Sequence, residues 1–259
     1  PFSLVVRSGV DDGGKETLRY IIENAAPGDS ITIANEIDTI KLAYILPITK
    51  NIIINGNGKT IQPVIPGTDF NPFTLGTATN ETVNSIKLYN MELIGGKSTS
   101  GGIVLVNQYV KLYAENVIFK GGIASEYSGA VHCNSANGTD VEFVNCRFEN
   151  NTSENNAGAL YAKGKLTLNA CVFTGNSTRS NGSALANIGS ATIKNSVFEN
   201  NIASGSGNYG AAVFSSNTAS IMTFDGCSFI SNTNTNTSKG TAAFASSGNS
   251  TATFSNCTF

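Results

Sequence analysis

The sequence predicts an all-β protein that folds as a single right-handed parallel β-helix, and three repeated features carry this prediction. Phenylalanine recurs at intervals of 25 to 31 residues, at Phe119, Phe148, Phe173, Phe198, Phe229 and Phe259. Four of these phenylalanines continue as F-x-x-N, and a short motif of small residues follows each asparagine. The segments between the motifs alternate apolar and polar residues, as half-buried strands do. Because no helical pattern separates the repeats, we expect their strands to stack as the turns of a solenoid.

Residues 1–35 are expected to form an N-terminal cap, made of a strand and a short amphipathic helix. The helix is predicted over residues 15–25, where apolar residues recur at i, i+3, i+4 and i+7: Leu18, Ile21, Ile22 and Ala25. The turn residues of 11–14 precede it, and Pro27 follows it. A stack of coils exposes an apolar cross-section at its first turn, and a helix laid across that end covers it.

Residues 36–259 are expected to hold the parallel β-helix repeats. Strand-like runs occur early in this region, at 38–42, 51–54 and 85–88. Counting turns from about residue 30 gives about eight or nine turns stacked at the spacing of neighbouring strands. The sequence stops at Phe259, within a repeat, so we expect the natural chain to continue beyond it.

Two repeated positions predict how the turns bond and pack. The asparagine of F-x-x-N suits a bend, because it tolerates left-handed backbone angles and its amide can bond to the next asparagine of the stack. Four of the five cysteines lie two residues before a repeat phenylalanine, at Cys146, Cys171, Cys227 and Cys257. Two residues along a strand is the same face, so these sulfurs point inward with the phenylalanines. We expect free, packed thiols and neither disulfides nor a zinc site.

One further column has binding potential. The spacing places His132, Tyr161, Ala186, Phe214 and Phe244 at the same position of successive turns. If this column faces outward, Tyr161, Phe214 and Phe244 form an aromatic stripe on which sugar rings or a partner protein could stack. If it faces inward, the same residues are core. The alternation of the strands leaves both possibilities open, with core favoured.

Charge and composition limit the classes of function. The chain has 16 basic and 18 acidic residues, so no basic field attracts nucleic acid. No apolar run of about 18 residues is present to span a membrane. Charged residues make up only 13% of the chain, and neutral polar residues are abundant, a composition common in extracellular β-rich repeats.

Catalytic, cofactor-binding and metal-binding residues are not predicted. Glu149 and Glu199 share a position two turns apart, about 10 Å, near the upper limit for an inverting glycosidase pair. A charge beside a turn is more commonly a solvated side chain. His132, the single histidine, lies in a column of varied residues, which favours packing over acid–base chemistry.

With these motifs in view, the sequence resembles the polymorphic membrane protein repeat family and related adhesin-like β-helix proteins. The resemblance rests on the four F-x-x-N motifs, the following G-A motifs and the segment TLRYIIENAAPGDSITI at 17–33. It implies display at the cell surface, often as the passenger of an autotransporter or as part of a large anchored adhesin.

The resulting hypothesis is a non-enzymatic, secreted or cell-surface, adhesin-like domain. It would bind a host or environmental glycan or a surface protein, or act as a spacer, and would meet a membrane only through an anchor outside this sequence. The alternative is a carbohydrate-active enzyme, a polysaccharide lyase or a glycoside hydrolase, which requires aligned Asp or Glu with an Arg or Lys in a groove.

Overall fold

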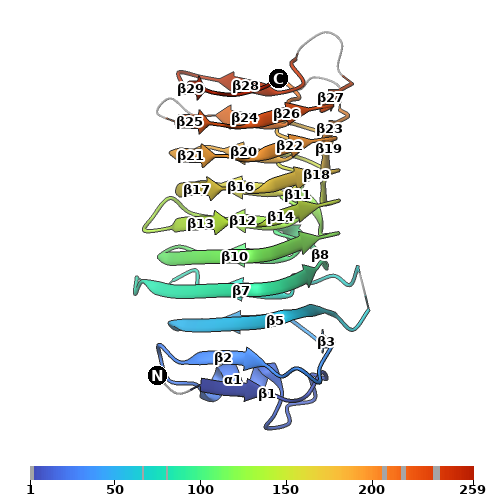
Figure 1. Ribbon diagram of the computed structural model, residues 1–259, viewed down its shortest axis with the longest axis vertical. Coiled ribbons are helices and arrows are strands. Elements are labelled where there is room, and N and C mark those ends of the chain that lie inside the picture. The colour runs from blue at the N-terminus through green and yellow to red at the C-terminus, as the bar shows by residue number, and fades with distance from the viewer. Residues whose placement is uncertain (1–2, 66, 80, 206–208, 217–219, 236–239) are drawn as a thin grey trace.

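The computed structural model is a parallel β-helix of about 9 turns with one helix, as Figure 1 shows. It describes residues 3–65, 67–79, 81–205, 209–216, 220–235 and 240–259. The predicted fold class, a right-handed parallel β-helix with a short N-terminal helix, is confirmed. All strand neighbours in the described part of the chain pair in parallel, each with a strand of the next turn.

The strands form three sheets. The long sheet contains, in spatial order, β1 (Ser3–Val6), β2 (Ser30–Ile33), β5 (Ile52–Pro63), β7 (Asn84–Ile94), β10 (Val110–Lys120), β13 (Asp140–Val144), β17 (Lys165–Asn169), β21 (Ala191–Lys194), β25 (Ile221–Asp225) and β29 (Thr251–Ser255). It is extended sideways by β3 (Thr39–Leu42), β14 (Arg147–Glu149), β18 (Val172–Thr174), β22 (Val197–Glu199) and β26 (Ser228–Ile230).

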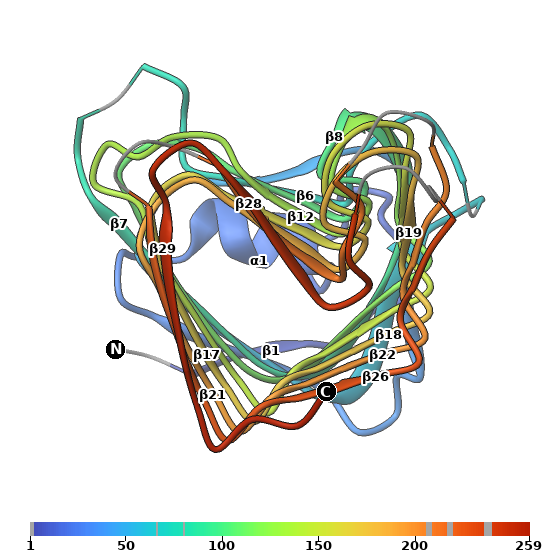
Figure 2. The same cartoon turned by 90° about the horizontal axis from the view of Figure 1, so that it is seen from above.

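Two narrower sheets complete each turn. The six-stranded sheet contains β8 (Lys97–Ser100), β11 (Ile123–Tyr127), β15 (Thr152–Ser153), β19 (Ser177–Thr178), β23 (Ile202–Ala203) and β27 (Thr233–Asn234). The eight-stranded sheet contains β4 (Leu46–Ile48), β6 (Phe73–Leu75), β9 (Val104–Val106), β12 (Val131–Cys133), β16 (Leu160–Ala162), β20 (Leu185–Asn187), β24 (Val213–Ser216) and β28 (Phe244–Ser247). Seen from above, the turns superimpose around one interior (Figure 2).

The helix α1 (Leu18–Asn24) lies at the N-terminal end of the stack, within the outline of the turns (Figure 2). The Thr17 hydroxyl caps it by accepting a hydrogen bond from the Tyr20 amide. Leu18, Ile21 and Ile22 are buried, as the sequence predicts. The strands β1 and β2 pair with each other, and β2 pairs with β5, so the long sheet already begins within residues 1–35.

A buried ion pair holds this end of the molecule, and sequence reasoning missed it. The Arg19 guanidinium donates to both carboxylate oxygens of Asp11, at 2.7 and 2.6 Å, and to the backbone carbonyls of Tyr44 and Ile45. Asp11 therefore does more than form a turn, because it neutralises an arginine that is only 4% exposed.

The repeat phenylalanines stack in one inward-facing column, which is buried from Phe119 to Phe229. Successive ring centroids are separated by 4.4 to 5.1 Å, from Phe119 to Phe259. The pair Phe148–Phe173 is the closest, at 4.4 Å with an interplanar angle of 2°. The spacing follows the rise of one turn, so each ring packs on the next throughout the repeat region.

The asparagines of F-x-x-N form a ladder, at Asn151, Asn176, Asn201 and Asn232, of which the first three are buried. The amides of the first three each bond to the oxygen of the next asparagine at 2.9 Å, so the predicted Asn–Asn bonds are confirmed. The expectation of left-handed backbone at these asparagines is wrong. The positive φ angles fall one residue earlier, for example at Asn150 (53°) and Gly175 (65°), because this residue turns the chain and leaves the ladder residue inside.

The five cysteines are free, and four of them are buried. The thiols of Cys146, Cys171 and Cys227 donate to backbone carbonyls of the preceding turn at 3.3 to 3.5 Å. Burial raises the pKa of Cys171 to about 11 and that of Cys133 to about 12. The inward thiols thus remain protonated and pack as small apolar groups.

Candidate functional site

The column predicted to bind ligand lies on the outer face of the eight-stranded sheet. Its members follow from the strand register: Thr74, Leu105, His132, Tyr161, Ala186, Phe214 and Ala245. The residues on either side of His132, Val131 and Cys133, belong to the main core. We call these seven residues the outer column.

The placement of Phe244 in this column is wrong. Phe244 pairs with Val213 and faces the interior, where its ring lies 5.3 Å from Phe254 and 5.9 Å from Phe224. Ala245 takes the outward position in its place. The register slips by one residue at this turn, and the slip packs the large ring against the main core and turns the small side chain to the outer face.

Tyr161 and Phe214 do face outward, but neighbouring turns cover them. Phe214 is only 7% exposed and packs with Ala157 and Ala186 in a small cluster separate from the main core. Tyr161 is half-buried, and its ring lies 5.2 Å from the Tyr127 ring. The column is therefore neither a fully exposed stripe nor part of the main core.

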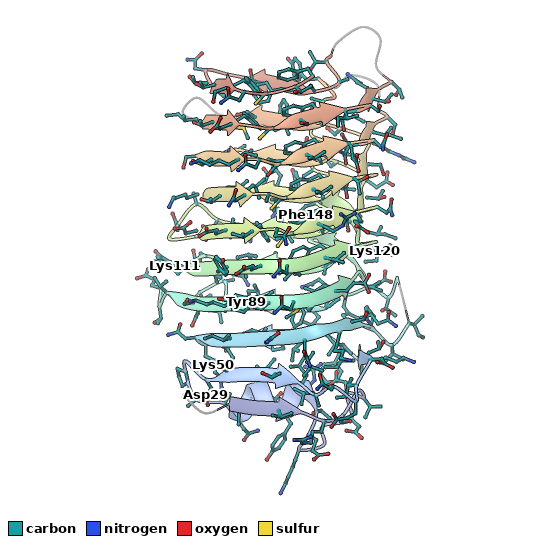
Figure 3. All side chains as sticks on the ribbon, in the orientation of Figure 1. Asp29, Lys50, Tyr89, Lys111, Lys120 and Phe148 are labelled. Carbon is teal, nitrogen blue, oxygen red and sulfur yellow. The ribbon has the colours of Figure 1, made fainter. Side chains whose placement is uncertain are left out.

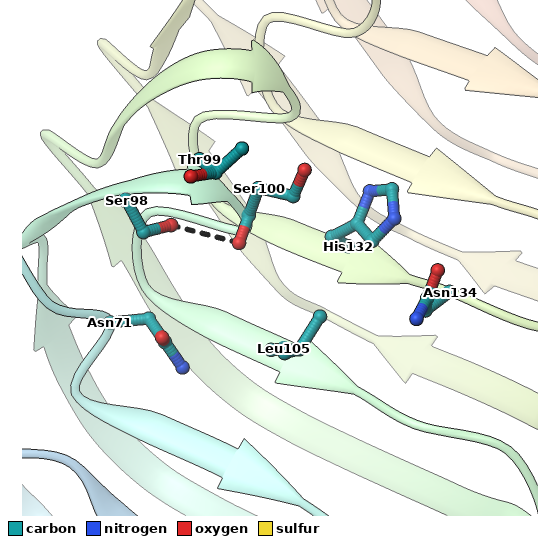
Figure 4. A pocket seen from close by; sticks show the side chains of 7 residues that line it. All are labelled: Asn71, Ser98, Thr99, Ser100, Leu105, His132 and Asn134. Atoms are coloured by element: carbon teal, nitrogen blue, oxygen red, sulfur yellow. Dashed lines mark hydrogen bonds between the residues drawn. The ribbon is translucent and has the colours of Figure 1, made fainter. Parts of the chain in front are cut away.

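A pocket of about 310 Å³ opens at the N-terminal part of the outer column. Seven residues line it: Asn71, Ser98, Thr99, Ser100, Leu105, His132 and Asn134 (Figure 4). Leu105 and His132 come from β9 and β12, and Ser98 to Ser100 come from the facing strand β8. None of these described lining residues is charged. We call this site the His132 pocket.

Hydrogen bonds fix the walls of the His132 pocket. The Asn71 amide nitrogen donates to the Phe73 carbonyl at 2.6 Å and to the Thr74 hydroxyl at 2.8 Å. The Ser98 hydroxyl donates to the Ser100 carbonyl at 2.8 Å. The pocket is thus lined by hydroxyl and amide groups on a pre-formed scaffold, which favours binding without rearrangement.

His132 forms one wall of the pocket and is held in place from behind. Its Nδ1 lies 3.4 Å from the Ser128 hydroxyl, and its ring stacks on Tyr161 at 5.0 Å with an interplanar angle of 11°. Burial, with a smaller contribution from Lys163, lowers the pKa of His132 to about 4. The imidazole is therefore neutral near pH 7.

This lowered pKa predicts a pH-dependent stability. The unfolded chain binds a proton with a histidine pKa near 6.5, whereas folded His132 resists protonation down to about pH 4. As the pH falls through this window, the unfolded state binds more protons, and the free energy of unfolding should drop by about 3 kcal/mol. Urea titrations between pH 7 and pH 4 measure this. In His132→Gln the part of this drop that comes from His132 should vanish. An equal pH dependence of the free energy of unfolding in both proteins would contradict the lowered pKa of His132.

Comparisons with known proteins add no family assignment. No family model, no curated protein and no solved structure matches this chain. Within the described residues, no helix is long and apolar enough to cross a membrane. The part of the chain that the structure describes also holds no group of three or more His, Cys, Asp or Glu arranged to bind a metal ion.

A second, smaller pocket lies on the outer face of the long sheet. It measures about 170 Å³, and its lining includes Lys111, Tyr113, Asp140, Glu142 and Lys165. Tyr89 on β7 and Lys111 on β10 lie on neighbouring turns of this face (Figure 3). Sequence reasoning missed this site, although outward positions on adjacent strands could have been aligned by counting back from the repeat phenylalanines.

The chemistry of the second pocket centres on Tyr113. Its hydroxyl donates to Glu115 at 2.9 Å, and its ring lies 5.7 Å from the Tyr89 ring. Burial and this hydrogen bond raise the pKa of Tyr113 to about 12, and Glu142 contributes in the same direction. Glu142 pairs with Tyr113 in the strand register, so two carboxylates flank one phenol.

The carboxylate pair considered from the sequence is in register, as expected. Glu149 and Glu199 are separated by Thr174 on the turn between them. Arg147 lies 2.6 Å from the Glu149 carboxylate and neutralises it. Glu149 is thus engaged in an ion pair, and its side chain is only 18% exposed, less than a fully solvated side chain would be.

Proposed function

We propose that this chain is a non-enzymatic, secreted or cell-surface, adhesin-like domain that binds glycan at the outer column. The observation that carries the proposal is the His132 pocket, whose lining combines hydroxyl groups, amide groups and an imidazole with no charged side chain. Sugars present many hydroxyl groups and apolar ring faces, and a site of this composition matches both.

A glycan fits this surface better than a partner protein does. Protein interfaces depend on buried aromatic or arginine anchors near the centre of a patch of roughly 800 Å² on each partner. Here the aromatic residues Tyr161 and Phe214 are already packed against the chain itself. What remains accessible at the pocket is small and combines polar with apolar surface. The extracellular location rests on the resemblance and on the low content of charged residues.

The second candidate function is a carbohydrate-active enzyme, either a polysaccharide lyase or a glycoside hydrolase, acting at the second pocket. Glu142 lies opposite Tyr113, and Glu115 lies two residues further along the neighbouring strand. Strand geometry separates their Cα atoms by about 8 Å. Glycosidases use two carboxyl groups that flank the scissile bond, and side chains that start from these two positions can approach one bound sugar. This cluster is the observation that favours the enzyme, and it is on a different face from the His132 pocket.

A glycan array combined with polysaccharide turnover assays tests the two candidates together. We expect the chain to bind glycan without turnover, and Tyr161→Ala to lower binding by about tenfold because the wall behind His132 is lost. Tyr89→Ala is the matched control, a half-buried tyrosine of the other face, and should leave binding unchanged. Turnover that disappears in Glu142→Gln would establish the enzyme instead. Binding to surface proteins alone would contradict the glycan proposal.

A further inference from the structure

The His132 pocket exists because a small residue stands where the next turn has a tyrosine. Ser100 on β8 and Tyr127 on β11 are strand partners. The Tyr127 ring lies 5.8 Å from the His132 ring and 5.2 Å from the Tyr161 ring, so it covers the outer column at its own turn. One turn earlier, the short Ser100 side chain cannot reach so far, and Leu105 stays partly exposed. The pocket is thus the space that a tyrosine side chain fills in the following turn.

His132 closes one end of this space and offers no open ring face. It is only 4% exposed, because the rings of Tyr161 and Tyr127 lie against it. Leu105 supplies partly exposed apolar surface to the pocket, and Ser98, Thr99 and Ser100 bring hydroxyl groups from β8 (Figure 4). Apolar surface beside hydroxyl groups suits one sugar residue, whose ring carries both kinds of surface.

A further pocket adjoins the His132 pocket along β8. It measures about 230 Å³ and is lined by Asp69, Lys97, Ser98, Thr99 and Ser125. We call it the Lys97 pocket. Ser98 and Thr99 line both pockets, so the two are neighbours on one strand. An extended strand spans about 10 Å between Lys97 and Ser100, a length that two linked sugar rings can follow.

The strand that joins the two pockets has an open edge. β8 is the first strand of the six-stranded sheet and pairs only with β11 in the described part of the chain. The residues before β6 bond to the other edge at its start, where the Lys97 amide donates to the Thr68 carbonyl at 2.8 Å. Because the main-chain groups of a strand alternate between its two sides, those of Thr99 face this same edge. They add donors and acceptors to the side-chain hydroxyls between the pockets.

An ion pair gives the Lys97 pocket its charged groups. The Lys97 ammonium lies 3.4 Å from the Asp69 carboxylate, and the two side chains are 52% and 86% exposed. An ion pair this exposed is weak, so both groups can exchange partners with a ligand. The carboxylate can accept a hydrogen bond from one sugar hydroxyl, and the ammonium can donate to the next. Two adjacent hydroxyl groups therefore match both charges at once.

We propose that the two pockets form one site for a glycan of at least two residues, with one residue against Leu105 in the His132 pocket and the next at the Lys97–Asp69 pair. The proposal rests on the proposed function and specifies the length of its ligand and a second contact. The ligand class is an oligosaccharide whose second residue carries two adjacent hydroxyl groups. Lys97 is then a specificity-determining residue, because a single sugar in the His132 pocket does not reach it.

NMR titration with monosaccharides and their disaccharides tests the proposal. The probes are glucose, mannose, galactose and N-acetylglucosamine, each compared with its own disaccharide. We expect at least one disaccharide to bind at least about tenfold more tightly than its monosaccharide, because hydrogen bonds to charged groups are added. Lys97→Gln should reduce this gain to less than about threefold and leave monosaccharide binding unchanged. Lys120→Gln is the matched control, an ion-paired lysine of similar exposure on the long sheet, and should keep the full gain.

Ser100→Tyr tests the first position of the site. It places a phenol beside Leu105, as Tyr127 shows that this sheet accepts, and should weaken every bound probe by at least about tenfold because the sugar's place is filled. Thr233→Tyr is the matched control, a similar change at an exposed position of the same sheet, and should alter binding by less than about twofold. Far-ultraviolet circular dichroism establishes that each variant is folded. If Ser100→Tyr fails to fold, the exposed Lys97→Gln change still decides the proposal.

The outcomes separate this inference from the proposed function. Equal affinity for monosaccharides and disaccharides, or a gain that survives in Lys97→Gln, overturns the two-residue site and leaves glycan binding intact. Unchanged binding in folded Ser100→Tyr overturns the placement of the first residue in the His132 pocket. Binding of no probe overturns the inference, and the glycan array then decides the proposed function on its own.

Discussion

Asn176→Ala should lower the free energy of unfolding by about 3–5 kcal/mol, because one side chain completes four buried hydrogen bonds. Its Nδ2 donates to the Phe148 carbonyl and to Asn201 Oδ1, both at 2.9 Å. Its Oδ1 accepts from the backbone and side-chain nitrogens of Asn151 at 3.0 and 2.9 Å. Alanine leaves the Asn151 amide and the Phe148 carbonyl buried without these partners.

Urea denaturation followed by circular dichroism measures this loss. Asn169→Ala is the matched control, since Asn169 lies on the outer face of the long sheet and its side chain is only a weak acceptor for Asn195, at 3.5 Å. That variant should differ from the parent by less than about 0.5 kcal/mol. Equal effects of the two substitutions would mean that the ladder contributes nothing beyond an ordinary surface amide.

The ladder and the phenylalanine column were predictable because each repeat places the same residue in the same environment. An interval of 25 to 31 residues exceeds any helical or hairpin period, and only stacking of whole turns explains it. Once Phe148 is placed on Phe173, the inward position of Cys146 follows from alternation, and the contact of Asn151 with Asn176 follows from the equal offset of three residues in each repeat. The sequence therefore determines the fold and most of the register.

The error at Phe244 shows where this reasoning fails. The backbone nitrogens of Ala184 and Leu185 both bond to the Ala212 carbonyl, whereas those of Ala212 and Val213 bond to Ala242 and Ala243 in turn. The last of these turns is thus displaced by one residue. Ala242, Ala243 and Ala245 are small and apolar on both sides of Phe244, so the sequence pattern gives no sign of which face is inside.

The His132 pocket was beyond prediction for a different reason. It forms where β8, the residues before β6 and the part of the outer column at Leu105 and His132 meet, and these segments precede the F-x-x-N repeats. The sequence placed His132 and Tyr161 in one column correctly, but it gave no measure of how far Ser98 to Ser100 stand from them. That distance depends on the turn between the two narrower sheets, which changes from one repeat to the next.

Phe173→Ala should destabilise the protein by about 3–5 kcal/mol, the usual cost of removing a buried phenylalanine ring. The ring is 0% exposed and lies between Phe148 at 4.4 Å and Phe198 at 5.0 Å. The neighbouring rings cannot close the gap, because the backbone turns that carry them are fixed by the Asn151–Asn176–Asn201 ladder. The cavity therefore remains, and both neighbours lose a stacking partner.

A matched control separates this packing effect from the loss of any aromatic ring. Phe259 belongs to the same column but is 69% exposed. It stacks on one ring, that of Phe229 at 5.1 Å, and contacts the Phe254 ring edge-on. Phe259→Ala should cost less than about 1 kcal/mol.

In a solenoid each turn contacts mainly its neighbours, so a defect at Phe173 should also weaken the coupling between the turns on either side of it. We therefore expect Phe173→Ala, and not Phe259→Ala, to broaden the urea transition, and an equally sharp transition in both would show that the stack does not transmit cooperativity along the rod.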